Sequence, residues 1–207
     1  MFKGTPELIE QRREEIVNAC EQLYQTRGFK EITLKDIGNV TSFSRPTIYN
    51  YFQTREEIFL ALYEREYDRW NEDLEAILGA KKMSVKELAD VLAKSIEKRK
   101  QLLKLLSMNN YDMEANSREE LLVSFKKAYG KSMENVQQIL KKHCTGMDEG
   151  DIRKFIYIFF PFMFGIYPYT SVTDKQKDAM LSAKVAFEYQ SVYEITYQCL
   201  ISLLGES

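Results

Sequence analysis

Histidine is almost absent from this sequence of 207 residues, because His143 is its single example. A ferritin-like di-iron enzyme needs a Glu-x-x-His pair on each of two helices, so one histidine excludes that class. The three cysteines, Cys20, Cys144 and Cys199, lie far apart and match no metal-binding or redox spacing. The sequence also lacks a Walker loop, a dinucleotide-binding glycine pattern and a nucleophile–base pair. We therefore expect no metal, no cofactor and no enzyme activity.

Strand-like alternation and long apolar runs are also scarce. Apolar residues recur at helical spacing instead, which predicts an all-α protein. The most apolar segment, residues 155–169, is shorter than a membrane-spanning helix, and Pro161, Gly165 and Pro168 interrupt it. The N-terminus is charged and polar from Lys3 onward, which predicts that there is no signal peptide. We expect a cytoplasmic protein with no membrane partner.

Three helix-capping signals follow one another within residues 32–60. Each of three short apolar patterns is preceded by a threonine or serine that fits an N-cap. These signals are Thr33 with Asp36, Ser44 with Pro46 in the following turn, and Thr54 with Glu57. Helices of about two turns are not stable alone, so the first two must pack together across the tight turn at residues 41–43. Such a pair presents its second helix to the major groove of DNA.

The second of these helices has a buried side and an outward side. At about 100° per residue, Ile48 and Phe52 share one side, which must anchor the helix. The opposite side carries Pro46 and Asn50, flanked by Thr47 and Tyr49. Arg45 is nearer the buried flank, but it lies at the helix N-terminus and has a long side chain. Together these residues can bond guanine and adenine edges or contact a thymine methyl. An ordinary helical hairpin with a solvated face is the alternative, but Tyr49 and Tyr51 are out of place on such a face.

Overall charge gives no sign of a nucleic-acid partner, since the net charge is −2. The local balance is different. Between residues 27 and 55 the acids are Glu31 and Asp36, against the bases Arg27, Lys30, Lys35, Arg45 and Arg55. This modest basic surface predicts weak non-specific affinity for DNA and steep sensitivity to salt.

Residues 12–64 resemble the DNA-binding domain of the tetracycline-repressor (TetR) family of bacterial transcription regulators. The signature residues, in the family's order and spacing, are Ser44-Arg45-Pro46-Thr47-Ile48-Tyr49-Asn50-Tyr51-Phe52 and then Thr54-Arg55-Glu56-Glu57-Ile58. The resemblance implies contacts with a double-stranded DNA operator at Thr33, Lys35, Arg45, Pro46, Thr47, Tyr49, Asn50, Tyr51 and Arg55. One departure is Ser42, where the family commonly has glycine in the turn. A left-handed serine there would be strained by about 1 kcal/mol.

The remainder of the chain is similar to the family in architecture and length. We expect a helix-turn-helix DNA-binding domain at residues 1–53, a connecting helix at 54–78 shared by both domains, and a larger helical ligand-binding and dimerisation domain at 79–207, with about nine helices. Periodicity and caps predict helices over residues 6–27, 54–78, 84–96 with an extension to 108, 117–143, from 151 through the apolar segment, and 174–204.

Two sets of residues in this larger part are candidates for function. Apolar and methionine side chains that can line an adaptable ligand pocket are Met108, Tyr111, Met113, Phe125, Tyr129, Met133, Tyr157 and Met163; plain core is the alternative for each. A stripe that fits the four-helix bundle of a family homodimer is Tyr189, Val192, Tyr193, Thr196, Leu200 and Leu203; an entirely intramolecular core is the alternative.

The sequence therefore predicts a sequence-specific DNA-binding transcription regulator. Family habit favours a homodimeric repressor that a small apolar ligand, whose identity the sequence does not give, releases from a near-palindromic operator. The alternative is a helical interaction protein of the same fold that acts through a protein partner rather than through DNA.

Overall fold

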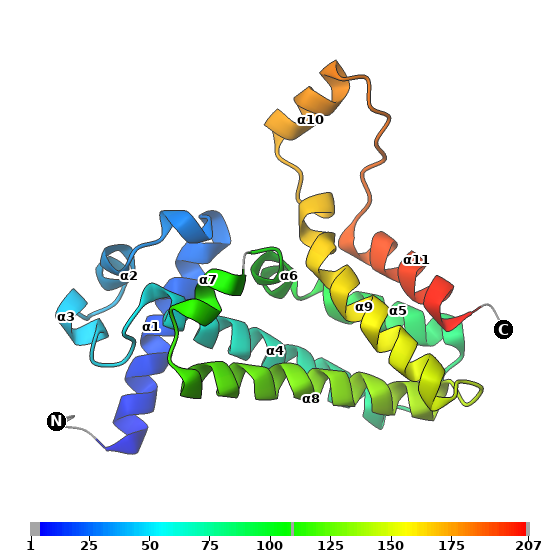
Figure 1. Ribbon diagram of the computed structural model, residues 1–207, viewed down its shortest axis with the longest axis horizontal. Coiled ribbons are helices and arrows are strands. Elements are labelled where there is room, and N and C mark those ends of the chain that lie inside the picture. The colour runs from blue at the N-terminus through cyan, green and yellow to red at the C-terminus, as the bar shows by residue number, and fades with distance from the viewer. Residues whose placement is uncertain (1–4, 109, 206–207) are drawn as a thin grey trace. The chain divides into compact units, whose positions relative to one another are not determined.

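The computed structural model describes residues 5–108 and 110–205 (Figure 1). These residues form eleven α-helices and one short 3-10 helix, with no β-strand among them, as the all-α prediction requires. The helices are α1 (Pro6–Thr26), η1 (Phe29–Glu31), α2 (Leu34–Val40), α3 (Arg45–Ile48), α4 (Arg55–Gly79), α5 (Val85–Glu97), α6 (Lys100–Leu106), α7 (Asn110–Ala115), α8 (Glu119–His143), α9 (Glu149–Thr170), α10 (Asp174–Ser182) and α11 (Val192–Leu204).

The contacts of the chain group these helices into two compact units. We call them the head unit, Met1–Glu66 with Met108–Tyr129, and the bundle unit, Tyr67–Ser107 with Gly130–Ser207. The head unit contains α1, α2, α3, α7 and the first parts of α4 and α8. A segment more than forty residues further along the chain therefore belongs to the same compact unit as the helix-turn-helix.

The predicted helix caps are present where the signal is local. Thr33 Oγ1 accepts a hydrogen bond from the backbone N–H of Asp36 at 3.2 Å, and Asp36 accepts one in return from the N–H of Thr33 at 2.9 Å. Ser84 and Glu87 form the same reciprocal box at the start of α5. Each box satisfies backbone donors that a helix N-terminus leaves without intrahelical partners, which fixes where α2 and α5 begin.

Aromatic side chains fill the core of the head unit. Phe59 of α4 is fully buried, with ring centroids 5.2 Å from Tyr24 of α1 and 4.7 Å from Phe29 of η1. Ile16 and Cys20 line the same face of α1 and are also fully buried. Burial raises the pKa of the Cys20 thiol, so this cysteine is an inert apolar core residue.

The bundle unit packs around α9. α6 and α11 both lie against α9, and α11 lies more extensively against α5. Trp70 of α4 is fully buried in this unit, with its ring centroid 5.8 Å from that of Phe160 on α9, and its indole N–H donates to Ser95 Oγ on α5 at 3.1 Å. One side chain thus ties three helices together.

The predicted helix over residues 84–108 is wrong in one respect, because it is two helices. α5 ends at Glu97, and Arg99 leaves the helical conformation with φ −100° and ψ 42° before α6 begins. The Arg99 guanidinium donates to the Asp73 carboxylate of α4 at 2.9 and 2.6 Å. This anchor holds the chain at the point where it turns to bring α6 onto α9. Helical periodicity in the sequence gives no indication of a contact with a distant helix.

The starts of α8 and α9 also differ from the prediction. α8 begins at Glu119, two residues after the expected Ser117. α9 begins at Glu149, because Asp148 is the N-cap and Asp151 is its capping-box partner instead of the first helical residue. The predicted start at Asp151 was therefore two residues too late.

α9 also contradicts the expected interruption of the apolar segment. It runs without a break through Pro161 and Pro168. Each proline removes one backbone hydrogen bond, but both lie on the exposed side of the helix, where water can satisfy the freed carbonyl. No single described helix has the length and apolarity to cross a bilayer, and only α9 and α10 taken together, bent by 84°, meet those two criteria.

The last predicted helix, residues 174–204, is wrong as a single helix. α10 ends at Ser182, Lys184 takes the left-handed conformation with φ 55°, and α11 begins only after its cap at Ser191. In Figure 1, α10 and the segment that follows it extend away from α9 and α11. Tyr189 therefore lies in this extended segment and not on a helix.

Candidate nucleic-acid interface

The recognition element is a single α-helical turn that continues as a hydrogen-bonded turn. Ser44 caps α3, its Oγ accepting from the N–H of Thr47 at 3.4 Å. After Ile48, the N–H groups of Tyr51 and Phe52 both donate to the carbonyl of Ile48, at 2.9 and 3.0 Å. The helical path therefore extends to Phe52, and a helix this short depends on tertiary contacts for its stability.

The buried face of this element is the one that the sequence predicted, and the outward candidates are exposed except for Thr47 and Tyr51. Ile48 and Phe52 are fully buried, and Arg13 of α1 lies over the Phe52 ring at 4.5 Å. Arg45, Pro46 and Asn50 are exposed. The remaining outward candidates are Thr47, which is half-buried with its hydroxyl 2.9 Å from that of Ser44, and Tyr49, which is 42% exposed.

Arg45 and Tyr49 form one preorganised group on this face. The guanidinium of Arg45 donates to the hydroxyl of Tyr49 at 2.9 Å and lies 5.5 Å from its ring centroid. A guanidinium held in this way loses less side-chain freedom when it meets a base edge or a phosphate. The two side chains should therefore act as a pair in any contact with DNA.

The turn between α2 and α3 is relaxed, so the strain considered for Ser42 does not arise. Among the described residues other than glycine, positive φ occurs only at Lys184. The backbone N–H and the hydroxyl of Ser42 both donate to Glu15 Oε1 of α1, at 3.1 and 2.9 Å. A carboxylate from α1 thus stabilises the turn without the glycine that the family commonly uses.

The structure places Tyr51 inside the head unit. Its side chain is 7% exposed, and its hydroxyl accepts from the guanidinium of Arg12 at 3.0 Å. Its carbonyl accepts from Arg13 and from Arg118, each at 3.3 Å. These contacts fix the end of the recognition element, so we leave Tyr51 out of the DNA-facing surface proposed below.

Arg55 is also engaged within the protein. One guanidinium nitrogen donates to the carbonyls of Phe29 and Ile32 at 3.3 and 3.2 Å, and the other pairs with Glu56 at 2.8 Å. The guanidinium also lies 4.2 Å from the Phe29 ring centroid. Arg55 therefore links the segment around η1 to the start of α4, and its predicted phosphate contact stays a prediction.

The two candidates before α3 have different surroundings. Lys35 is exposed on α2. Thr33 is exposed too, but its hydroxyl is part of the cap of α2, and the hydrogen bonds that it and its N–H make lower the pKa of Asp36. Lys35 can extend outward to contact DNA. The Thr33 hydroxyl could contact DNA only while it also caps α2.

The ligand-pocket candidates are divided between the two units. Met108, Tyr111, Met113, Phe125 and Tyr129 belong to the head unit, and Met133, Tyr157 and Met163 to the bundle unit. Met113, Phe125 and Met163 are buried, whereas Tyr111 is 81% exposed. In the bundle unit a surface groove of about 260 Å³ is lined by Met133, Gln137, Lys141, Glu149, Ile152, Arg153, Ile156 and Tyr157. Its charged lining differs from the apolar pocket expected.

The dimerisation candidates fall into two groups, one buried and one at least partly exposed. Val192, Thr196 and Leu200 are buried within the protomer, on the side of α11 that packs against its own α5 and α9. Tyr189 is exposed, and Tyr193 and Leu203 are half-buried. The Tyr193 hydroxyl donates to Asp90 of α5 at 2.8 Å, which raises the pKa of that tyrosine.

In the described part of the chain, no three His, Cys, Asp or Glu side chains lie close enough together to hold a metal ion. His143 is buried, and its Nδ1 accepts from the backbone N–H of Met83 at 3.0 Å. Burial lowers the pKa of this histidine. It is therefore a neutral residue that holds the segment before α5.

Sequence reasoning missed the residues that support the recognition element from a distance. Arg12, Arg13 and Glu15 look like ordinary surface charges of α1, and Arg118 lies far along the chain. A signal for them would have required a pairing between distant positions, which a single sequence does not display. With these supports, the described residues define a helix-turn-helix protein whose second helix presents arginine, tyrosine and amide side chains outward, a DNA-binding class of protein.

Comparison with known proteins identifies the family. The family model "Bacterial regulatory proteins, tetR family" matches residues 16–62, and the model "Tetracyclin repressor-like, C-terminal domain" matches residues 64–189. The second alone spans more than half of the chain. The protein belongs to the TetR family of bacterial transcription regulators, and it is a DNA-binding regulator and not an enzyme.

Individual relatives agree with this family. The transcriptional regulator YfiR of Bacillus subtilis is 26% identical over 153 residues, which are 73% of each chain. Among solved structures, the fatty acid degradation regulator FadR from Bacillus halodurans has a TM-score of 0.61 at 14% identity, covering 99% of this chain and 97% of its own. FadR from B. subtilis in complex with stearoyl-CoA has a TM-score of 0.60 at 17% identity, covering 92% and 97%. At these identities the two structures show the fold alone.

Proposed function

We propose that the protein binds a near-palindromic operator as a homodimer, represses transcription there, and is released by a small apolar effector. The observation that supports DNA binding is the division of the recognition element, residues 45–52, into a buried and an outward face. Ile48 and Phe52 are buried, while Arg45, Tyr49 and Asn50 are exposed together on the outward side. Arginine and amide side chains are those that read guanine and adenine in the major groove.

The contribution of the outward face can be measured with two substitutions. We expect Asn50→Ala and Tyr49→Ala each to weaken specific operator binding by about 1–3 kcal/mol. Asn50 loses its amide, and the loss of Tyr49 also frees Arg45 from the hydroxyl that holds it. Duplexes selected from a random pool by the wild-type protein supply the operator, and fluorescence anisotropy gives the affinities.

A matched control for Asn50 is Gln22→Ala, which removes an exposed amide from α1. It should leave operator affinity unchanged. Asn50→Ala that binds as tightly as the wild-type protein would refute the assignment of the groove-facing side.

The alternative function is interaction with a protein partner through the same fold. It predicts the opposite result for the selection experiment. A protein that does not read DNA enriches no sequence from the pool at low salt. The outward arginine, tyrosine and amide of α3 favour the DNA function.

The dimer that we propose uses the outer face of α9. Tyr157 is 70% exposed, Ile158 50% and Phe164 38%, and all three lie along one helix of the bundle unit. Large apolar side chains gathered on one helix face indicate an interaction surface. Tyr189, Tyr193 and Leu203 can extend this surface, whereas Val192, Thr196 and Leu200 already belong to the core of the protomer.

The effector that we propose is small and apolar. Buried methionine and aromatic side chains, among them Met113, Phe125 and Met163, supply adaptable apolar surroundings in both units. The stearoyl-CoA bound by B. subtilis FadR, which shares the fold, makes a long-chain acyl compound the first one to test.

An effector of this kind should stabilise the protein and weaken operator binding together. A ligand that binds only the folded chain raises the melting temperature, and a coupling of about 1–3 kcal/mol to DNA would lower operator affinity roughly 5- to 150-fold. We would titrate stearoyl-CoA, coenzyme A alone and an aromatic carboxylic acid in melting and anisotropy experiments. A compound that raises the melting temperature without changing operator affinity would argue against effector-controlled release. Tyr129→Ala, which alters a half-buried candidate position, should change both responses in parallel.

A further inference from the structure

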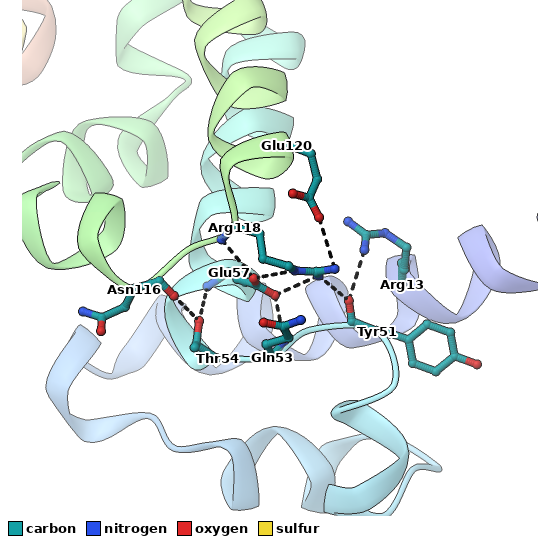
Figure 2. A network of polar contacts seen from close by, with 8 residues as sticks. All are labelled: Arg13, Tyr51, Gln53, Thr54, Glu57, Asn116, Arg118 and Glu120. Carbon is teal, nitrogen blue, oxygen red and sulfur yellow. Dashed lines mark hydrogen bonds and ion pairs between the residues drawn. The ribbon is translucent and has the colours of Figure 1, made fainter. Parts of the chain in front are cut away.

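Two segments that are distant in the sequence meet beside the recognition element, inside the head unit (Figure 2). One is the exit from α3, residues 51–54, and the other is the connection between α7 and α8, residues 116–118. Thr54 Oγ1 donates to the carbonyl of Asn116 at 2.8 Å, and the guanidinium of Arg118 donates to the carbonyl of Tyr51 at 3.3 Å.

Glu57 is the centre of this meeting point. Its side chain is 1% exposed, and its Oε2 accepts from the backbone N–H of Gln53 at 2.7 Å. Arg118 supplies three more hydrogen bonds: its backbone N–H and Nε donate to Glu57 Oε1 at 3.1 and 2.7 Å, and Nη2 donates to Oε2 at 3.0 Å. Arg118 also pairs with Glu120 at 3.3 Å.

The electrostatics show that Glu57 is charged here. Burial raises the pKa of Glu57, but the hydrogen bonds from Arg118 and from two backbone N–H groups outweigh it, so the pKa lies below its usual value. The hydrogen bond to Glu57 raises the pKa of Arg118. A two-pronged guanidinium–carboxylate pair is strong and directional, and a buried carboxylate without its partner is costly.

The position of the pair matters because α3 is too short to hold its own direction. The last residues of the recognition element are fixed through the carbonyl of Tyr51 and the N–H of Gln53, and both bond to members of this network. Glu57 lies in the part of the chain matched by the DNA-binding family model, whereas Arg118 lies in the part matched by the C-terminal one.

We propose that Arg118, acting through Glu57, is a positioning residue for operator recognition, which the C-terminal family region supplies to the DNA-binding element. The pair holds residues 51–54, and with them the outward face of α3, in the orientation that reads DNA. Any change in the connection between α7 and α8 therefore reaches the recognition element through this ion pair and the hydrogen bonds beside it, from Thr54 to Asn116 and from Arg118 to Tyr51. This inference rests on the proposed operator binding.

The test compares Arg118→Gln with Arg118→Lys in the full-length protein. Arg118→Gln should speed amide hydrogen exchange in residues 49–54 at least tenfold and lower operator affinity at least tenfold. Affinity for a random duplex should stay within twofold, because phosphate contacts do not require the exact pose of α3. Arg118→Lys keeps the charge but not the two-pronged geometry. Its operator affinity should therefore lie between that of Arg118→Gln and that of the wild-type protein.

Two further variants isolate the pair. Lys126→Gln breaks the exposed ion pair with Glu114 in the same unit, 3.0 Å long, and should change neither readout. Glu57→Gln combined with Arg118→Gln should cost no more operator affinity than the worse of the two single changes, because residues that act together are not additive.

Three results would overturn the inference. They are unchanged exchange in residues 49–54, an equal loss of operator and random-duplex affinity, or faster exchange across both units, which would mean that the pair supports folding only. A wild-type protein that selects no duplex would instead refute the proposed function. The exchange experiment needs no DNA, so it would still decide whether the pair holds residues 49–54.

Discussion

Charge on the outer face of α9 should convert the protein into a monomer that no longer holds its operator. In the proposed dimer, Ile158→Asp with Phe164→Asp places two carboxylates in an apolar interface, where they would lose water without gaining partners. A monomer reads one half-site at a time, so the affinity for the full operator should fall roughly 10²- to 10⁴-fold. Sedimentation velocity at micromolar concentration measures the assembly, and anisotropy measures the DNA affinity.

The control for this pair of changes is Val123→Asp, which adds the same charge at an exposed apolar position of α8. It should remain dimeric. Changes at Val192 or Leu200 would not serve, because both side chains are buried inside the protomer and a carboxylate there would disturb folding. A wild-type protein that sediments as a monomer would refute the homodimer.

The two-fold symmetry of the proposed dimer also determines the arrangement of its operator. A two-fold dimer presents two copies of α3, and DNA accepts them about one helical turn, or 34–36 Å, apart. Selected duplexes should therefore contain two inverted half-sites at this spacing.

The sequence predicts what short-range chemistry decides. Thr33 and Ser84 were assigned as caps from an acidic partner three residues on, and Ser44 from the proline in the following turn; all three cap their helices in the structure. The buried side of α3 was predictable for the same reason, since Ile48 and Phe52 are one helical turn apart.

The errors arise where a distant segment decides the local structure. The break between α5 and α6 lies at Arg99, whose guanidinium binds α4, and nothing within residues 84–108 indicates that partner. The segment between α10 and α11 shows the limit of periodicity in another way. Its apolar residues continue a helical spacing, but the chain leaves the helix near the left-handed Lys184.

The same limit applies to the site. Tyr51 and Arg55 match the family pattern in sequence, but the structure shows both making contacts within the head unit. Glu57 was recognised as a capping residue. Its second role, as the acceptor for Arg118, depends on a partner 61 residues away.

Removal of the single tryptophan should cause the largest loss of stability in the bundle unit. Trp70 is fully buried and contacts α5 through Ser95 and α9 through Phe160. Trp70→Ala leaves a large cavity and removes the donor to Ser95, so the free energy of unfolding should fall by about 3–5 kcal/mol. Urea titration followed by circular dichroism measures the change without relying on the fluorescence that the substitution removes.

Two milder variants separate packing from hydrogen bonding at this position. Trp70→Phe keeps an aromatic ring in the core and loses the indole donor, whereas Ser95→Ala keeps the indole and leaves its N–H without the acceptor. Because an unmet buried donor costs about 1–3 kcal/mol, Ser95→Ala should be the more damaging of these two, and both should be milder than Trp70→Ala. A loss below about 1 kcal/mol for Trp70→Ala would mean that α4, α5 and α9 are held together without this side chain. The core of the bundle unit would then have to be assigned to other contacts.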